Sequence, residues 1–205
     1  MVQSQWPVVG SASTAARMEA NTSSVAAYGY HADNPSPLTE DVPAGGSREH
    51  YYSAQKAECE ALIAKSTAGS GLDVYVLRPC IVAGPRATTL ADSMPWTRWG
   101  RSLPALVTSA VRGIPGLRPL VPDPGVRVQL VHHDDVAAAI VAAVVGRGAP
   151  GAYNLAADGD VSLTEIAHAL GARSVRIPQG SVRAASVALA RLPYVPSSAE
   201  WLHAF

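Results

Sequence analysis

The sequence is poor in cysteine and has no excess of charge of either sign. Its 205 residues include only two cysteines, Cys59 and Cys80, and 16 basic residues balance 16 acidic ones. Two thiols in an expected helix and an expected strand do not form a disulfide framework. A reducing cytoplasm is therefore expected, with both side chains acting as small buried hydrophobes. Without a basic surface, neither a nucleic acid nor an anionic membrane is an expected partner.

Long hydrophobic runs are also missing. The longest, residues 136–145, is well short of the ~18–20 apolar residues that span a membrane. Residues 1–20 have neither the basic start nor the apolar core of a signal peptide, which again favours a cytoplasmic protein. Glycine is scarce at the start, where Gly10 is the only one before Gly29.

The rest of the chain alternates between strand and helix patterns, which predicts an α/β fold with a parallel sheet. Ser47 is expected to cap a helix over residues 48–67, which ends before Gly69 and Gly71. Residues 72–79 form a nearly continuous apolar run with β-branched members, the pattern of a buried parallel strand.

Further strands and helices are predicted downstream. Asp134 or Asp135 is expected to cap a helix that ends near Val145, and Ser162 with Glu165 forms a capping box. The expected strands are 126–131, 153–156 and 174–177, and further helices are expected at 103–112 and 182–192. Between 85 and 127 lies a long excursion whose Trp96 and Trp99 either line a substrate pocket or cover the core.

The strongest chemical signal is Tyr52 followed four residues later by Lys56. Positions i and i+4 of a helix lie on one face, so the ammonium can lower the pKa of the phenol and suit it to proton transfer near neutral pH. Tyr51 does not have this spacing. Alternatively, Tyr52 and Lys56 are surface residues of an amphipathic helix and have no catalytic role.

The order of the motifs along the chain adds to this signal. Ser24 ends a Thr-Ser-Ser segment shortly before Tyr28-Gly29, and Tyr52 and Lys56 follow. Next come the Leu-Arg-Pro-Cys-Ile-Val-Ala-Gly-Pro segment at 77–85, the Leu-Val-His-His-Asp-Asp-Val-Ala segment at 130–137 and Tyr-Asn-Leu at 153–155. In this order the motifs resemble the extended short-chain dehydrogenase/reductases, also called the NAD-dependent epimerase/dehydratase family.

The resemblance implies a Ser-Tyr-Lys catalytic site. Ser24 would hydrogen-bond the substrate's carbonyl or hydroxyl oxygen, and Tyr52 would be the general acid/base on that oxygen. Lys56 would lower the pKa of Tyr52 and bind the nicotinamide ribose. The cofactor would be NAD or NADP, and the substrate a small alcohol, ketone or sugar. A homodimer is an assembly that the resemblance allows.

The resemblance also implies residues that border the nicotinamide: Thr22, Ser23, Pro79, Cys80 and Val82. No metal is expected. The His-His-Asp-Asp segment at 132–135 could suggest ligands, but successive residues of a strand point to opposite faces of its sheet.

The family pattern is incomplete in this chain. No Gly-x-x-Gly-x-x-Gly turn precedes Ser24, and residues 17–21 replace the apolar strand that should lead to it. The fold expected is an incomplete Rossmann-like, doubly wound parallel sheet of later strands only, with part of a small C-terminal substrate lobe and an open edge. Residues 1–21 would be an unmatched segment, and 22–205 the catalytic and substrate-binding part.

Two functions follow from this pattern. The first is an oxidoreductase-type enzyme that transfers a hydride. The second is a truncated, non-catalytic fragment or binding protein that cannot hold the dinucleotide by itself. For an enzyme, Ile81 and the apolar excursion lean towards a sterol-like or flavonoid-like alcohol over a nucleotide sugar.

Overall fold

The computed structural model describes residues 17–87, 120–123, 125, 127–176 and 178. The chain divides into two compact units. The first unit combines Met1–Gly84 with Leu130–Asp158, and the second combines Pro85–Gln129 with Gly159–Phe205. The helices expected at 103–112 and 182–192, and Trp96 and Trp99, lie outside the described residues.

A three-stranded parallel sheet forms the centre of the first unit, in the order β1-β2-β7. The strands are β1 (Met18–Thr22), β2 (Asp73–Pro79) and β7 (Gly151–Leu155). Leu77 in β2 lies opposite Thr22 on one side and Tyr153 on the other. The prediction of a buried parallel strand at 72–79 is therefore confirmed.

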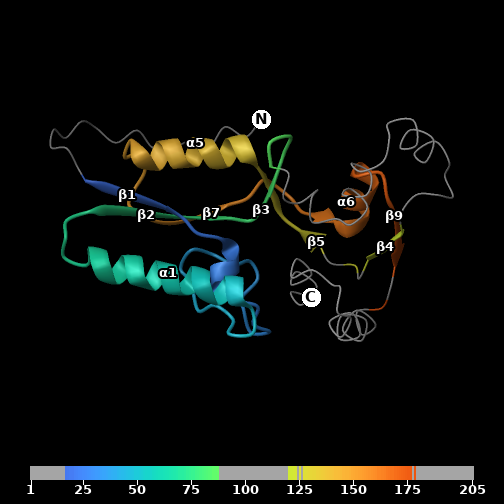
Figure 1. Ribbon diagram of the computed structural model, residues 1–205, viewed down its shortest axis with the longest axis horizontal. Helices are drawn as coiled ribbons and strands as arrows, with labels where there is room; N and C mark the ends of the chain where they lie inside the picture. The colour runs from blue at the N-terminus through green and yellow to red at the C-terminus, as the bar shows by residue number, and fades with distance from the viewer. Residues whose placement is uncertain (1–16, 88–119, 124, 126, 177, 179–205) are drawn as a thin grey trace. The chain divides into compact units, whose positions relative to one another are not determined.

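One helix covers each face of this sheet (Figure 1): α5 (His133–Val144) one side and α1 (Tyr51–Thr67) the other. On the α5 side, Tyr75 and Leu77 pack with Ala139 and Ala143 in an apolar core. The small alanines let the helix approach the sheet closely. The buried residues of α1 are instead Ser53, Ala57 and Glu60, so polar groups lie beneath this helix.

The expected start of α1 was wrong by one turn. Ser47 does not cap the helix, because its hydroxyl accepts a hydrogen bond from the backbone N–H of Tyr30 at 2.7 Å. The helix begins at Tyr51 after His50, whose side chain makes no capping hydrogen bond. Its end at Thr67, just before Gly69 and Gly71, is as predicted.

The strand that leads to Ser24 is present, contrary to expectation. Residues Met18–Thr22 form β1 despite their polar composition, because parallel pairing with β2 satisfies the backbone groups along one side of the strand. Among the described residues β1 pairs with β2 alone. The division of the chain at residue 22 stays a prediction.

The single strand expected at 126–131 is two short strands. β5 (Arg127–Val128) pairs antiparallel with β8 (Val161–Ser162), whereas β6 (Leu130–His132) pairs parallel with β3 (Ile81–Ala83). Helix α5 is capped by His132, not by Asp134 or Asp135, because the His132 ring accepts a hydrogen bond from the Asp134 N–H. Gly146 follows its end at φ +69°, as predicted.

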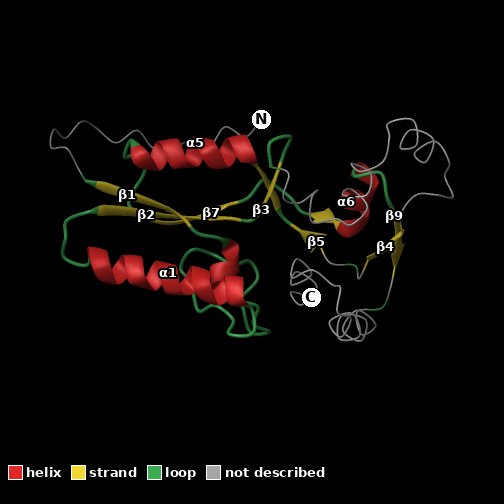
Figure 2. Cartoon of the chain, in the orientation of Figure 1, coloured by secondary structure: helices red, strands yellow, loops and turns green. Residues whose placement is uncertain are grey.

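In the second unit, α6 (Leu163–Ala169) opens with the predicted capping box of Ser162 and Glu165. β4 (Leu120–Asp123) pairs parallel with β9 (Arg173–Arg176) (Figure 2). Asp123 is buried. The hydrogen bond from the Thr164 hydroxyl holds its pKa below the ordinary value, and the Gly125 N–H acts in the same direction against the effect of burial.

Within the described part of the chain, no helix is both long and apolar enough to cross a membrane.

Candidate active site

The first turns of α1 bring Tyr52 and Lys56 together. The Lys56 Nζ lies 5.7 Å from the centre of the Tyr52 ring and donates a hydrogen bond of 3.0 Å to the carbonyl oxygen of Thr22. Tyr52 is half exposed, so its phenol can meet a ligand. The ammonium therefore joins the helix to the end of β1 and places a positive charge beside the phenol.

Ser24 lies directly after this strand end and caps the short 3-10 helix η1 (Val25–Tyr28). Its Oγ accepts a hydrogen bond of 3.2 Å from the Ala26 N–H, which leaves its own O–H to donate elsewhere. Ser53, the neighbour of Tyr52, donates 2.6 Å to the Ala26 carbonyl. Two hydrogen bonds thus connect the backbone that carries Tyr52 with the Ser24 hydroxyl.

Two other tyrosines lie near this site. Tyr51 is 68% exposed, and its hydroxyl accepts a hydrogen bond from Gln55 at 2.5 Å. Tyr30 was not predicted as a neighbour; burial raises its pKa, and the nearby Tyr52 raises it further. No periodicity in the sequence places Tyr30 beside α1, because a loop delivers it.

The predicted nicotinamide-bordering residues differ in how far they are buried. Thr22 is exposed, Cys80 and Val82 are half-buried, and Pro79 is buried. Ser23 is only 3% exposed, and its hydroxyl donates to Glu60, so its side chain faces the protein. Their roles as cofactor contacts stay a prediction.

The two cysteines are free thiols, as expected. Burial raises the pKa of Cys80 to about 11, so this thiol stays protonated at neutral pH. Cys59 is exposed on α1, which corrects the expectation that both cysteines are buried. Helix periodicity turns Cys59 outward, because its neighbour Glu60 takes the inward position.

A buried ion pair beneath the site was not predicted. The Arg78 guanidinium donates two hydrogen bonds to the Glu60 carboxylate, Nε to Oε1 at 3.1 Å and Nη2 to Oε2 at 2.6 Å. Burial alone would lower the pKa of Arg78, but hydrogen bonds to Glu60 and Tyr28 raise it overall. Two signals could have revealed the pair: an arginine within an apolar strand, and a glutamate one turn beyond Lys56.

This ion pair extends into a longer network. Arg78 Nη1 donates 2.8 Å to the Tyr28 hydroxyl, and that hydroxyl donates 2.7 Å to Asn154 Oδ1. The Asn154 side-chain amide donates to the Leu38 carbonyl, and its backbone N–H donates to Glu40. The network therefore ties η1, α1, β2 and β7 to the loop that precedes α1.

The His132, His133 and Asp134 side chains lie closer together than expected. Their ligand atoms all lie within 4.8 Å of one another, and the two imidazole rings meet edge to face with centroids 4.3 Å apart. Strand alternation does not separate these side chains, because His133 is already the first residue of α5. Since the His132 ring caps the helix, this grouping has a structural explanation, and the absence of a metal stays a prediction.

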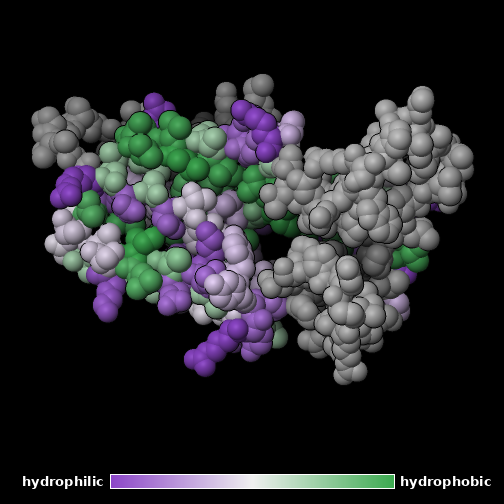
Figure 3. Space-filling model, viewed as in Figure 1, coloured by the Kyte–Doolittle hydropathy of each residue, from purple (hydrophilic) through white to green (hydrophobic). Residues whose placement is uncertain are grey.

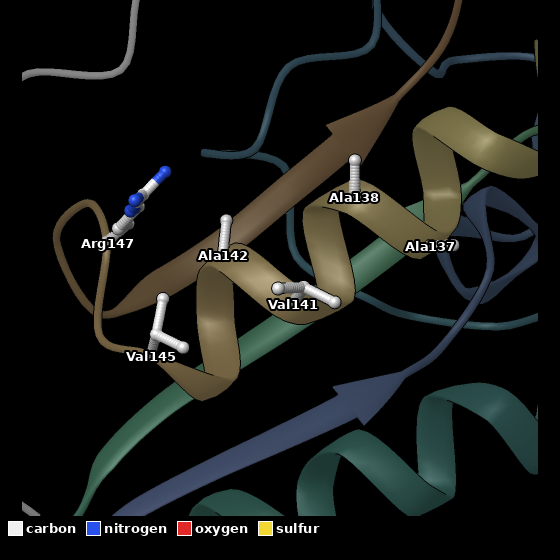
Figure 4. Close-up of a pocket in the computed structure, with 6 residues that line it drawn as sticks. All are labelled: Ala137, Ala138, Val141, Ala142, Val145 and Arg147. Carbon is white, nitrogen blue, oxygen red and sulfur yellow. The ribbon is translucent and has the colours of Figure 1, made fainter.

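A pocket of about 450 Å³ lies on α5, on the face of the sheet opposite α1 (Figure 4). Arg147 is the one polar side chain of its lining, which consists of Ala137, Ala138, Val141, Ala142, Val145 and Arg147. Figure 3 shows hydrophobic residues gathered over this helix, where Val141 and Val145 are more than half exposed. None of the predicted site residues lines the pocket, so it is separate from the acid/base site.

The residues near Lys56 fit the nicotinamide end of a dinucleotide by their chemistry. An ammonium, a phenol and the exposed Thr22 side chain are groups that can hydrogen-bond ribose hydroxyls. For the pyrophosphate end of the dinucleotide, the described residues offer no comparable set of groups. Among the described residues, β6 passes directly into α5 and β8 into α6, with no glycine-rich turn between strand and helix.

The parallel sheet with a helix on each face is a Rossmann-like arrangement. The sequence model of the NAD dependent epimerase/dehydratase family matches residues 4–156. The chain belongs to that family, and the resemblance drawn from its motifs is confirmed.

Solved structures of this class share the fold at low sequence identity. The UDP-N-acetylglucosamine 4-epimerase of Methanobrevibacter ruminantium M1 is 21% identical, with a TM-score of 0.54 over 78% of this chain and 49% of that protein. RMD of Pseudomonas aeruginosa, solved with NADPH, is 22% identical with a TM-score of 0.57 over 78% and 54%. The dTDP-glucose 4,6-dehydratase DesIV of Streptomyces venezuelae, solved with NAD, is 21% identical with a TM-score of 0.54 over 80% and 48%.

This chain therefore spans about half the length of the solved relatives that it matches. No curated protein matches it significantly.

Proposed function

We propose that this chain carries the acid/base part of an NAD(P)-dependent oxidoreductase, epimerase or dehydratase site made of Ser24, Tyr52 and Lys56. The observation that carries the proposal is the Lys56 ammonium, which lies beside the Tyr52 ring while it binds the Thr22 carbonyl two residues before Ser24. In this proposal the Tyr52 phenol and the Ser24 hydroxyl hydrogen-bond the same substrate oxygen.

Each residue has a separate task. The Ser24 O–H donates to the substrate's carbonyl or hydroxyl oxygen and holds it. The Tyr52 phenol gives a proton to that oxygen or takes one from it, and the Lys56 ammonium stabilises the phenolate form. When bound, the nicotinamide supplies or accepts the hydride.

The substrate class that suits this chemistry is a secondary alcohol or the matching ketone, including sugars. The solved relatives named above include an epimerase and a dehydratase whose names specify nucleotide sugars. Both substrate classes, nucleotide sugars and less polar alcohols, therefore belong in the assay.

The second candidate is a binding protein without catalysis. The sequence before Ser24 offers a single glycine, Gly10, where a pyrophosphate-binding turn needs several. We therefore expect the chain alone to bind NADH with a dissociation constant above about 10 μM, corresponding to a free energy weaker than roughly −7 kcal/mol. Fluorescence titration measures this directly, and tighter binding would show that this chain holds the dinucleotide by itself.

The experiment for the catalytic site uses the chain fused behind the dinucleotide-binding half of a family member. Tyr52→Phe should lower kcat by about 10²-fold or more, because it removes the transferred proton but little volume. Tyr51→Phe is the matched control and should leave kcat unchanged. NADH formation at 340 nm gives the rates on alcohols, and chromatography of the products gives them on nucleotide sugars, because an epimerase or dehydratase returns the hydride and accumulates no NADH. A Tyr52→Phe enzyme that keeps more than about a tenth of the rate, a loss under ~1.4 kcal/mol, would contradict the assignment.

A further inference from the structure

The Glu60–Arg78 ion pair lies beneath the proposed site and is almost fully buried. The two side chains are 9% and 7% exposed, and they meet through two hydrogen bonds. Removing two charges from water offsets much of their attraction, so a buried ion pair is weak evidence of a gain in stability. The alternative explanation for the buried pair is that it fixes the geometry of the segments that it joins.

Glu60 shares a helix face with the proposed catalytic pair. Tyr52, Lys56 and Glu60 follow one another at intervals of four residues, so they lie along one side of α1. A bond that holds Glu60 therefore also limits rotation of α1 about its axis, and with it the direction in which the Tyr52 phenol points.

The same ion pair holds both ends of the segment that carries Ser24. The Ser23 hydroxyl donates 2.5 Å to Glu60 Oε1, and Arg78 Nη1 donates 2.8 Å to the hydroxyl of Tyr28, the last residue of η1. Ser24 lies between these two anchors. The ion pair is thus joined to the helix of Tyr52 and to the turn of Ser24.

We propose that Glu60 and Arg78 are positioning residues. They hold α1 against residues 23–28 so that Tyr52 and Ser24 can hydrogen-bond the same substrate oxygen. Neither residue touches the substrate; both act through Ser23, Tyr28 and the helix. This inference rests on the proposed function, since it concerns the alignment of that site.

The test replaces the ion pair without leaving a buried charge. The double variant E60M/R78M keeps similar volume, and exchanges of this kind are often neutral for folding. The matched control, R127M/D160N, removes the exposed ion pair of the second unit, whose atoms lie 2.8 Å apart. The full chain is labelled with 3-fluorotyrosine, and the ¹⁹F resonance of Tyr52 is identified by its loss in Tyr52→Phe.

We expect E60M/R78M to melt cooperatively within about 5 °C of the parent, while the Tyr52 resonance shifts and broadens. The control should leave that resonance unchanged. In the fused enzyme, kcat should fall by about 10²-fold with KM unchanged, as expected when reacting groups are misplaced by about 1 Å. A folded double variant with an unaltered Tyr52 resonance would overturn the proposal.

Glu60→Gln provides a second measurement if the double variant does not fold. It keeps an acceptor oxygen for Arg78, so a smaller shift of the Tyr52 resonance is expected, and no shift would again overturn the proposal. The proposed function and the positioning role of Glu60 and Arg78 can be refuted separately. Full turnover in Tyr52→Phe would refute the proposed function, whereas an unaltered resonance with an inactive Tyr52→Phe would refute only the positioning role.

Discussion

Replacing Arg78 alone by methionine should destabilise the protein strongly. Arg78 donates three hydrogen bonds within the first unit, two to Glu60 and one to Tyr28. Its loss leaves the Glu60 carboxylate buried with the Ser23 hydroxyl as its remaining donor in this network. Leaving one partner of a buried pair uncompensated costs about 3–5 kcal/mol, which is a large part of the roughly 5–15 kcal/mol that stabilises a domain.

Urea unfolding followed by far-UV circular dichroism measures this loss as a lower transition midpoint at constant slope. Arg127→Met is the matched control: it breaks an exposed pair with Asp160 and should leave the midpoint nearly unchanged. A loss under about 1 kcal/mol for Arg78→Met would refute the reasoning, and so would an equal loss in both variants.

Two further predictions concern titratable groups. With Ellman's reagent at pH 8, Cys59 should react quickly and Cys80 more than about 100-fold more slowly, because burial raises the pKa of Cys80 to about 11; equal rates in Cys59→Ser and Cys80→Ser would contradict this. Since the fold lowers the pKa of Asp123, its stabilisation is complete above the ordinary value of about 3.9 and is lost as pH falls through the lowered one. Asp123→Asn should therefore flatten the acid limb of the stability profile, and an unchanged limb would argue against it.

Much of the first unit could be predicted because its signals are local. The apolar run of β2 and the glycines after α1 depend on neighbours within a few residues, and so does the capping box of α6 in the second unit. β1 could not be predicted, because its residues form a strand through pairing with β2, more than 50 residues further along the chain. The false cap at Ser47 has a similar cause, since the Tyr30 N–H competes for its hydroxyl.

The sequence by itself determined which residues could carry the chemistry. The four-residue interval between Tyr52 and Lys56 places both on one helix face wherever that helix packs. Only the tertiary structure decided what surrounds them. The partner of Lys56 is the Thr22 carbonyl, 34 residues away, and Tyr28 meets Asn154 across 126 residues. Periodicity describes one segment at a time, whereas these contacts exist only once the strands have paired and α1 has packed against them.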